Sequence, residues 1–296
     1  MPYPIANLPY GLRCRLSELT TKRERYNLQI AAGGASICPP KLQLMYRVKE
    51  QYYFDCDNSE LIVREMIGAT ETRNCLFDND SPLHYASYVV FTEIDLQYLS
   101  YDIFNNFYFG HGLFLHLDTC HLSQQFFEKM SDIIGSTVRS IEIDEITDDD
   151  LSGDVVHVQD SYNLNFTDVL TAFPNVAGIS VDVKNLSPSW MSEVMQFKKT
   201  KLTFLSVVVP AEQIPLLTVD EIIDLLKAQN NTFSLEIFCK AGHQSPVGKL
   251  IQAIKKLPQG EKSFATKCVS LVDYNTTFQY CLPTEEISCF NYGLTN

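Results

Sequence analysis

From residue 113 onward, short strand-like and helix-like segments alternate regularly along the sequence. Apolar and polar residues alternate in stretches such as LFLHLDTC (113–120) and TFSLEIFC (232–239), which is the period of a half-buried strand. Segments with helical spacing lie between them, among them SQQFFEKMSDIIG (123–135) and TVDEIIDLLKAQN (218–230). We therefore expect an α/β protein in which each strand is followed by a helix.

The spacing of these strand–helix pairs is typical of a repeat protein. The centres of successive predicted strands lie about 26 to 38 residues apart, a period seen in solenoids. The segment LFLHLDTCHL is similar to one leucine-rich repeat, with Cys120 where that repeat carries asparagine or cysteine. We expect a leucine-rich-repeat-like strand–helix solenoid over 111–296. A doubly wound sheet is the alternative, but it favours a glycine-rich first turn and longer apolar strands, and neither is present.

Local signals mark the helix starts and the core of this array. We expect the aromatic pair Phe126 and Phe127 and the single tryptophan, Trp190, to be buried. Prolines at 188 and 246 suit the first position of a helix. The candidate N-cap residues are Ser123, Ser187, Thr218 and Ser245.

The region 41–110 is less regular. Residues 46–56 predict a strand rich in tyrosine and phenylalanine, 60–68 fit either a strand or a helix, and 70–82 are typical of a loop. A strand and a helix are expected between 85 and 104. This region is either a connecting unit or the first irregular repeats of the array.

Two short helices are predicted in the basic N-terminal stretch LPYGLRCRLSELTTKRERYNLQIAAGG (8–34). Leu12, Leu16 and Leu19 recur at helical spacing and share one face. Thr21 and Glu24 fit a capping box that opens the second helix, which carries Tyr26 and Ile30 one turn apart. Residues 1–40 therefore form a helical module ahead of the rest.

This module resembles an F-box. In that family Leu-Pro opens the first helix, a leucine ladder follows, and a second helix begins after a polar turn. The resemblance covers about residues 4–35 and implies docking on a Skp1-like adaptor, which brings the chain to a cullin ubiquitin ligase. The sequence departs from the family after residue 30, where IAAGGASICPP lacks the basic residue and tryptophan of a third helix. The adaptor-binding residues implied by position are Leu8, Pro9, Leu12, Leu16, Leu19 and Tyr26.

The resemblance implies a non-catalytic substrate-recognition adaptor that binds a protein substrate through its repeats. Two other readings stay open. The helical module can instead cap the solenoid, since a repeat array needs a terminal unit with a polar outer face. The chain can also be a repeat-type interaction scaffold unrelated to ubiquitin transfer.

Catalytic and metal motifs are weak in this sequence. FGHGLFLHLDTCHL brings together zinc-ligand residue types, but His116 and Cys120 lie four positions apart on a strand, roughly 13 Å along its axis. No phosphate-binding loop or nucleophile elbow occurs. We expect no enzyme activity, cofactor or metal. An enzyme of unrecognised class would predict a pocket near His111, His116 and Asp118.

Charge and cysteine usage narrow the partners and the compartment. The net charge of −13 and the pI of about 4.9 disfavour broad binding to nucleic acid or to an anionic membrane. Nine cysteines without a CxxC pair, and a start without a secretory signal, are typical of reduced thiols. We expect a cytoplasmic or nuclear protein.

Overall fold

A computed structural model of the chain shows two compact units. The first takes in residues 1–164 and 168–176, and the second takes in 165–167 and 177–296. The predicted segments 1–40 and 41–110 both fall in the first unit. The residues that the structure describes are 7–32, 42–47, 51–57, 60–68, 71–145, 162–197, 202–239, 247–258, 267–272 and 277–283.

The first unit is built on an open sheet with the strand order β7-β6-β5-β2-β3-β4, and β1 also pairs with β5. β5 runs parallel to β1, β2 and β6, and β6 runs parallel to β7, whereas β2, β3 and β4 form antiparallel hairpins. The region 41–110 therefore continues directly into the strands of the predicted array. The strands are β1 (Met45–Tyr46), β2 (Gln51–Asp57), β3 (Glu60–Ile67), β4 (Glu71–Asn74), β5 (Leu83–Thr92), β6 (Phe107–Asp118) and β7 (Val138–Asp144).

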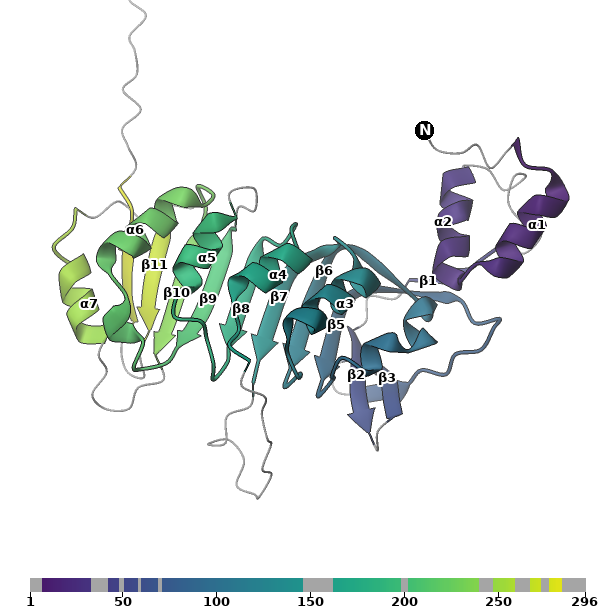
Figure 1. Ribbon diagram of the computed structural model, residues 1–296, viewed down its shortest axis with the longest axis horizontal. Helices are drawn as coiled ribbons and strands as arrows, with labels where there is room; N and C mark the ends of the chain where they lie inside the picture. Colours follow the sequence, from purple (N-terminus) through teal and green to yellow (C-terminus); the bar gives the residue numbers. More distant parts are fainter. Residues whose placement is uncertain are drawn as a thin grey trace, which may run out of the picture. The chain divides into compact units, whose positions relative to one another are not determined.

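Helix α3 lies along this sheet (Figure 1) and begins and ends where the sequence predicts. The hydroxyl of Ser123 accepts a hydrogen bond from the Phe126 N–H, and Gly135 ends the helix with φ of 73°, a conformation that favours glycine. Phe126 and Phe127 are fully buried, which confirms their core assignment. The helical elements of this part of the chain are α1 (Tyr10–Leu19), α2 (Lys22–Ala32), the 3₁₀ helices η3 (Tyr98–Ser100) and η4 (Asp102–Asn106), α3 (Gln124–Ile134) and α4 (Phe166–Ala172).

An aromatic cluster forms the core beneath β2, β5 and β6. The Phe54 ring stacks on Phe91 at 4.7 Å and on Phe104 at 5.4 Å, and it meets Phe107 edge-on at 5.1 Å. All four rings are buried. Rings at these separations gain attraction beyond the burial of their area, so this cluster joins the irregular first strands to the regular ones.

A recurring turn ends β5 and β6. Glu93 and Thr119 follow these strands with φ of 56° and 50°. The Glu93 N–H donates to the Asp118 carbonyl, and the Thr119 N–H donates to the Asp144 carbonyl. Cys120, just after the turn, is buried and its thiol donates to the Phe91 carbonyl at 3.2 Å. This hydrogen bond joins the residue after β6 to the neighbouring strand β5, and Cys120 is the residue predicted at the Asn/Cys position of a repeat.

The second unit has the strand order β12-β11-β10-β9-β8. β8 to β11 are parallel, and β12 adds to β11 in the antiparallel direction. Helices α5, α6 and α7 lie on one face of these strands (Figure 1). The elements are β8 (Gly178–Asp182), α5 (Trp190–Gln196), β9 (Phe204–Val209), the 3₁₀ helix η6 (Ile214–Leu216), α6 (Val219–Ala228), β10 (Ser234–Cys239), α7 (Val247–Ile254), β11 (Cys268–Val272) and β12 (Thr277–Cys281).

A capping box determines where α6 begins, and the single tryptophan lies in the core of this unit. Thr218 and Glu221 form the capping box of α6 by accepting from each other's backbone N–H. Trp190 is fully buried and packs near Phe166, at 6.2 Å between rings, so its core assignment is confirmed. The predicted N-cap at Ser187 is wrong, because α5 begins at Trp190 with Ser189 as its N-cap residue.

The α/β class and the alternation of strands and helices are confirmed, and several details of the first and last strands are corrected. Residues 60–67, for which strand and helix were both open, form a strand, and 71–74 form a strand where a loop was expected. The expected helix before 104 is two 3₁₀ turns. β12 was not predicted. The expected helix start at Ser245 and Pro246 lies outside the described residues.

Candidate functional site

Polar contacts from α2 attach the N-terminal helices to η4, to α3 and to the segment after β4. The Lys22 ammonium donates to the Asn106 side chain at 2.8 Å and to the Asp78 carbonyl. The Arg23 guanidinium donates to the carbonyl of Ile133, the penultimate residue of α3. The basic residues of this segment thus serve, at least in part, as attachments within the fold.

The capping box predicted between the two helices is present. The Glu24 carboxylate accepts the Thr21 N–H at 2.8 Å, and the Glu24 N–H donates to the Thr21 hydroxyl at 3.3 Å. The Arg25 guanidinium donates to the Ser17 and Thr20 carbonyls at the end of α1. These bonds fix the turn between the two helices, so the helices form a defined hairpin.

Four large apolar side chains of this hairpin are open to solvent. Leu12 is 55% exposed and Leu19 is 69% exposed, although large apolar side chains on a helix usually face a core. Tyr10 on α1 and Ile30 on α2 are 58% and 64% exposed. Exposed apolar side chains that gather in one small part of a protein are typical of an interaction site.

The other predicted site residues lie in mixed surroundings. Pro9 is exposed at the N-cap of α1, and Leu8 and Leu16 are partly buried. The Tyr26 ring meets the Tyr108 ring of β6 edge-on at 5.4 Å, so this side chain is engaged within the first unit. Of the predicted set, the structure therefore leaves Pro9, Leu12 and Leu19 exposed.

A second apolar strip, which the sequence analysis missed, follows the hairpin. Leu42, Leu44 and Tyr46 are exposed, whereas Gln43 between them is buried. The Gln29 side chain forms hydrogen bonds with both the backbone N–H and the carbonyl of Gln43. In this segment, which leads into β1, the polar residue Gln43 is buried and the flanking leucines are exposed. The alternating L-Q-L-M-Y pattern was a signal for it, but it did not show which side faces solvent.

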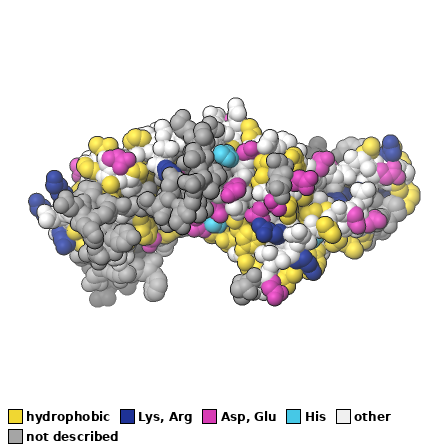
Figure 2. Space-filling view, turned by 90° about the horizontal axis from the view of Figure 1, so that it is seen from below, with side chains coloured by type: hydrophobic (Ala, Val, Ile, Leu, Met, Phe, Trp, Pro, Cys, Tyr) yellow, Lys and Arg dark blue, Asp and Glu magenta, His cyan; other side chains and the backbone are white. Residues whose placement is uncertain are grey.

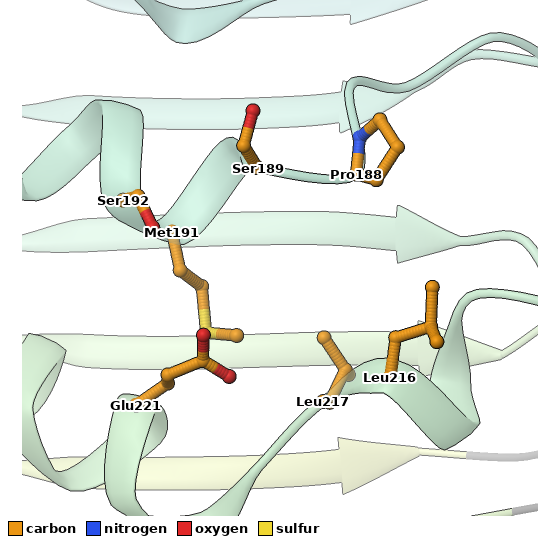
Figure 3. A pocket seen from close by; sticks show the side chains of 7 residues that line it. All are labelled: Pro188, Ser189, Met191, Ser192, Leu216, Leu217 and Glu221. Carbon is orange, nitrogen blue, oxygen red and sulfur yellow. The ribbon is translucent and has the colours of Figure 1, made fainter.

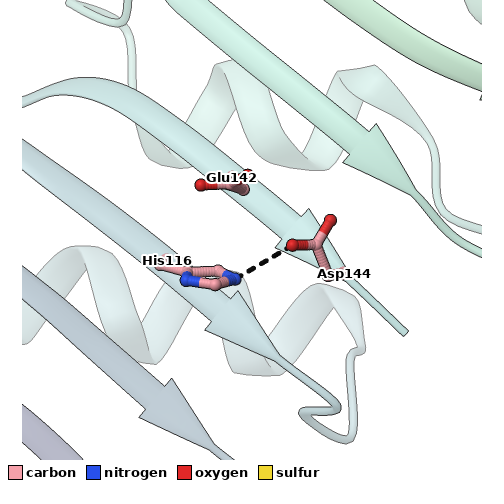
Figure 4. A group of neighbouring side chains, drawn as sticks. All are labelled: His116, Glu142 and Asp144. Atoms are coloured by element: carbon pink, nitrogen blue, oxygen red, sulfur yellow. Dashed lines mark hydrogen bonds and ion pairs between the residues drawn. The ribbon is translucent and has the colours of Figure 1, made fainter. Parts of the chain in front are cut away.

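Three potential metal-ligand side chains meet on β6 and β7. His116 on β6 is in register with Glu142 on β7, and Asp144 follows Glu142 on the same side of that strand. His116 Nε2 lies 3.0 Å from Asp144 Oδ2 (Figure 4). One donor atom from each of the three residues lies within 4.8 Å of those of the other two. Within the part of the chain that the structure describes, this is the one such group.

The electrostatics of this group follow from the neighbouring carboxylates. The hydrogen bond to Asp144 raises the pKa of His116, against the effect of burial, and the charges of Glu142 and Asp118 act in the same direction. Burial raises the pKa of Asp118, which precedes the turn at Thr119. Figure 2 shows the molecule from below, with acidic and histidine side chains gathered near the middle of the view.

The other histidine and cysteine candidates do not join this group. His111 and His121 are exposed, and His111 precedes the register shift of β6 near Leu113. Burial raises the pKa of the Cys120 thiol to about 12, so it is a poor metal ligand and a poor nucleophile. Of the residues proposed for an enzyme site, His116 and Asp118 share one side of β6.

A pocket of about 270 Å³ lies in the second unit between α5 and the start of α6 (Figure 3). Glu221 is its one titratable lining residue, and this side chain is already bonded to Thr218 in the capping box. General acid–base chemistry usually needs a second positioned group. This pocket therefore offers no acid–base pair. Its lining residues are Pro188, Ser189, Met191, Ser192, Leu216, Leu217 and Glu221.

Comparison with known proteins adds no family to these observations. No protein-family model, curated protein or solved structure matches the chain. None of the described helices has the length and apolar character that crossing a membrane requires.

Proposed function

We propose that this chain is a non-catalytic substrate-recognition adaptor of a Skp1-cullin-type ubiquitin ligase. The hairpin of α1 and α2 binds a Skp1-like adaptor, and the strand–helix units bind a protein substrate. The observation that carries the proposal is the exposure of Leu12 and Leu19 on α1. The other helix, α2, holds the hairpin to the rest of the unit through the polar contacts of Lys22 and Arg23. Their position matches the leucine ladder of the F-box resemblance.

The exposed leucines disfavour the alternative in which the hairpin is an end cap. A cap would turn its apolar ladder toward the first strands and its polar face toward water. Here the polar and aromatic residues Lys22, Arg23 and Tyr26 make the contacts to the rest of the unit. Leu12 and Leu19 remain available for a partner.

A substrate-binding role for the strand–helix units is supported by their layout. Consecutive strands are neighbours in the series β5-β6-β7 and β8-β9-β10-β11, as in a repeat array, and α5, α6 and α7 cover one face (Figure 1). A doubly wound sheet reverses its strand order and carries helices on both faces. The same layout also supports the second candidate, a leucine-rich-repeat-like interaction scaffold unrelated to ubiquitin transfer.

Burial of the two leucines against a partner would contribute enough binding free energy for its loss to be measured. Burying a leucine fully gives about 1.5–3 kcal/mol, so burying the exposed parts of Leu12 and Leu19 gives about 2–4 kcal/mol in total. Placing a carboxylate at each position removes this gain and adds a desolvation cost. We expect the double change Leu12→Glu/Leu19→Glu to weaken adaptor binding by at least about a hundredfold.

The test is a pull-down of the full chain, probed for a Skp1-like adaptor and a cullin. The matched control is Leu76→Glu, which changes a leucine that is 90% exposed and lies outside the hairpin. Recovery of both proteins with the parent and Leu76→Glu, but not with the double variant, supports the proposal. Equal recovery with all three refutes the assigned surface. If the parent recovers neither protein, the ligase role is wrong and the scaffold role takes its place.

Point variants are better here than removal of residues 1–40. Such a deletion would also remove Lys22, Arg23 and Tyr26, which contact the sheet and α3. A loss of binding could then follow from a disturbed fold. Circular dichroism of each point variant shows whether the fold is kept.

A further inference from the structure

We propose that His116, Glu142 and Asp144 form a binding site for a divalent transition-metal ion, with Zn²⁺ as the probe of choice. The inference departs from the sequence-based expectation of no metal, because the ligands come from two strands whose register the sequence does not reveal. It is independent of the adaptor role, since the site lies on β6 and β7 and the adaptor surface lies on α1.

The geometry of the three side chains suits one ion. Two ligands of a tetrahedral zinc ion, each at about 2.0–2.2 Å from it, lie about 3.3–3.6 Å apart. The three donor atoms lie within 4.8 Å of one another. Side-chain movements of about 1 Å therefore bring all three to a common centre. The direct bond between His116 and Asp144 would give way to two bonds to the ion.

The scaffold holds these side chains on a rigid support. Leu115 and Leu117 on β6, and Ile141 and Ile143 on β7, alternate with the proposed ligands and are almost completely buried on the opposite side of the sheet. The parallel pairing of the two strands fixes the register of His116 opposite Glu142. Ligands on packed strands need less ordering when an ion binds than ligands on loops.

The donor set selects the class of ion. An imidazole nitrogen favours Zn²⁺, Cu²⁺ and Ni²⁺ over Ca²⁺ and Mg²⁺, which prefer an all-oxygen shell. Asp118 is in register with Asp144 and interacts electrostatically with it and with His116. A third carboxylate at this position adds negative charge around the ion and can bind through a water molecule. The three protein ligands leave coordination positions for solvent.

The test is calorimetric titration of the full chain, stripped with a chelator, with Zn²⁺ and separately with Ca²⁺. We expect one Zn²⁺ per chain and at least about tenfold weaker binding of Ca²⁺. His116→Ala, and the near-isosteric Glu142→Gln and Asp144→Asn, should each weaken Zn²⁺ binding at least about tenfold. His121→Ala, which removes an exposed histidine just beyond β6, should bind Zn²⁺ like the parent.

Co²⁺ provides a second readout that separates this site from the cysteines. Binding through nitrogen and oxygen gives visible bands without the near-ultraviolet thiolate-to-metal transition, and these bands should disappear in Asp144→Asn. A strong thiolate transition would show that cysteine holds the ion and would overturn the assignment. The absence of saturable Zn²⁺ binding, or unchanged affinity in folded His116→Ala and Asp144→Asn, would overturn it as well.

Discussion

Glu193 lies at the centre of a small hydrogen-bond network in the second unit, and its removal is expected to destabilise that unit strongly. The side chain is buried and accepts the Phe166 N–H at 2.8 Å at the start of α4. Its other oxygen accepts from the hydroxyl of Ser189 at 2.7 Å and from that of Ser187. One carboxylate thus joins the start of α4 to the loop that precedes α5.

The magnitude follows from the three donors that Glu193→Ala leaves behind. A buried N–H without an acceptor costs about 1–3 kcal/mol, and two lost hydroxyl bonds cost about 1 kcal/mol each. We expect a loss of about 3–5 kcal/mol in the free energy of unfolding. With a urea slope of about 2 kcal/mol per molar, the midpoint falls by roughly 2 M. Glu193→Gln keeps an acceptor oxygen and should lose about half as much.

The assay is urea unfolding followed by tryptophan fluorescence. Trp190 is the single tryptophan of the chain, lies in the same helix as Glu193 and is fully buried, so the signal reports on the second unit. The matched control is Glu212→Ala, which removes an exposed carboxylate and should change stability by less than about 0.5 kcal/mol. If Glu193→Ala unfolds at the same urea concentration as Glu212→Ala, the network contributes no stability and the reasoning is wrong.

Three further predictions concern the first unit. Burial lowers the pKa of His84, so this side chain takes up a proton more readily in the unfolded state as the pH falls below about 6.5. The free energy of unfolding should therefore be constant above that pH and decline below it. Urea midpoints measured between pH 5 and 8 should show this decline, and His84→Gln should flatten it whereas His121→Gln should not. Phe54→Ala removes the central ring of the aromatic cluster and should cost about 3–5 kcal/mol in denaturant unfolding monitored by circular dichroism; a loss below 1 kcal/mol would contradict the packing described. Gly110→Ala places a methyl group against the ring of Tyr85 and should cost about 1–3 kcal/mol. A double-mutant cycle with Tyr85→Ala should recover most of that cost, and additive losses would show that the clash is not the cause.

Local signals in the sequence predicted the regular elements well. The capping pairs Thr21–Glu24 and Thr218–Glu221, and the N-cap at Ser123, depend on residues within one helical turn. Such interactions are determined by neighbours in the sequence, so they can be read from it. The same holds for the burial of Phe126 in an amphipathic helix.

Elements decided by distant residues were not predictable in the same way. The residues of β3 fit a helical or a strand period, and the choice is made by pairing with β2, where the Arg64 guanidinium donates to the Asp55 carboxylate at 2.8 Å. β12 depends on pairing with β11. Propensity gives way to tertiary pairing in such segments.

In both candidate sites, the sequence predicts the local feature and only the fold shows the feature that depends on distant residues. The spacing of Leu12 and Leu19 predicts that they share a helix face, but only the folded hairpin shows that this face is exposed. His116 and Glu142 are separated by a helix in sequence and meet through strand register. The alternation within each strand predicts which side chains face the core. Which residue of β6 lies opposite which residue of β7 is set by the pairing in the folded sheet.

The short strand β4 determines how the first sheet ends. Its four residues, Glu71 to Asn74, are polar and exposed, and Arg73 is tied back to the buried Glu65 of β3. A strand from another copy that added to this edge would have to desolvate the charged side chains of Glu71 and Arg73, a cost that disfavours growth of the sheet. This edge should therefore not recruit strands from other copies as the protein concentration rises.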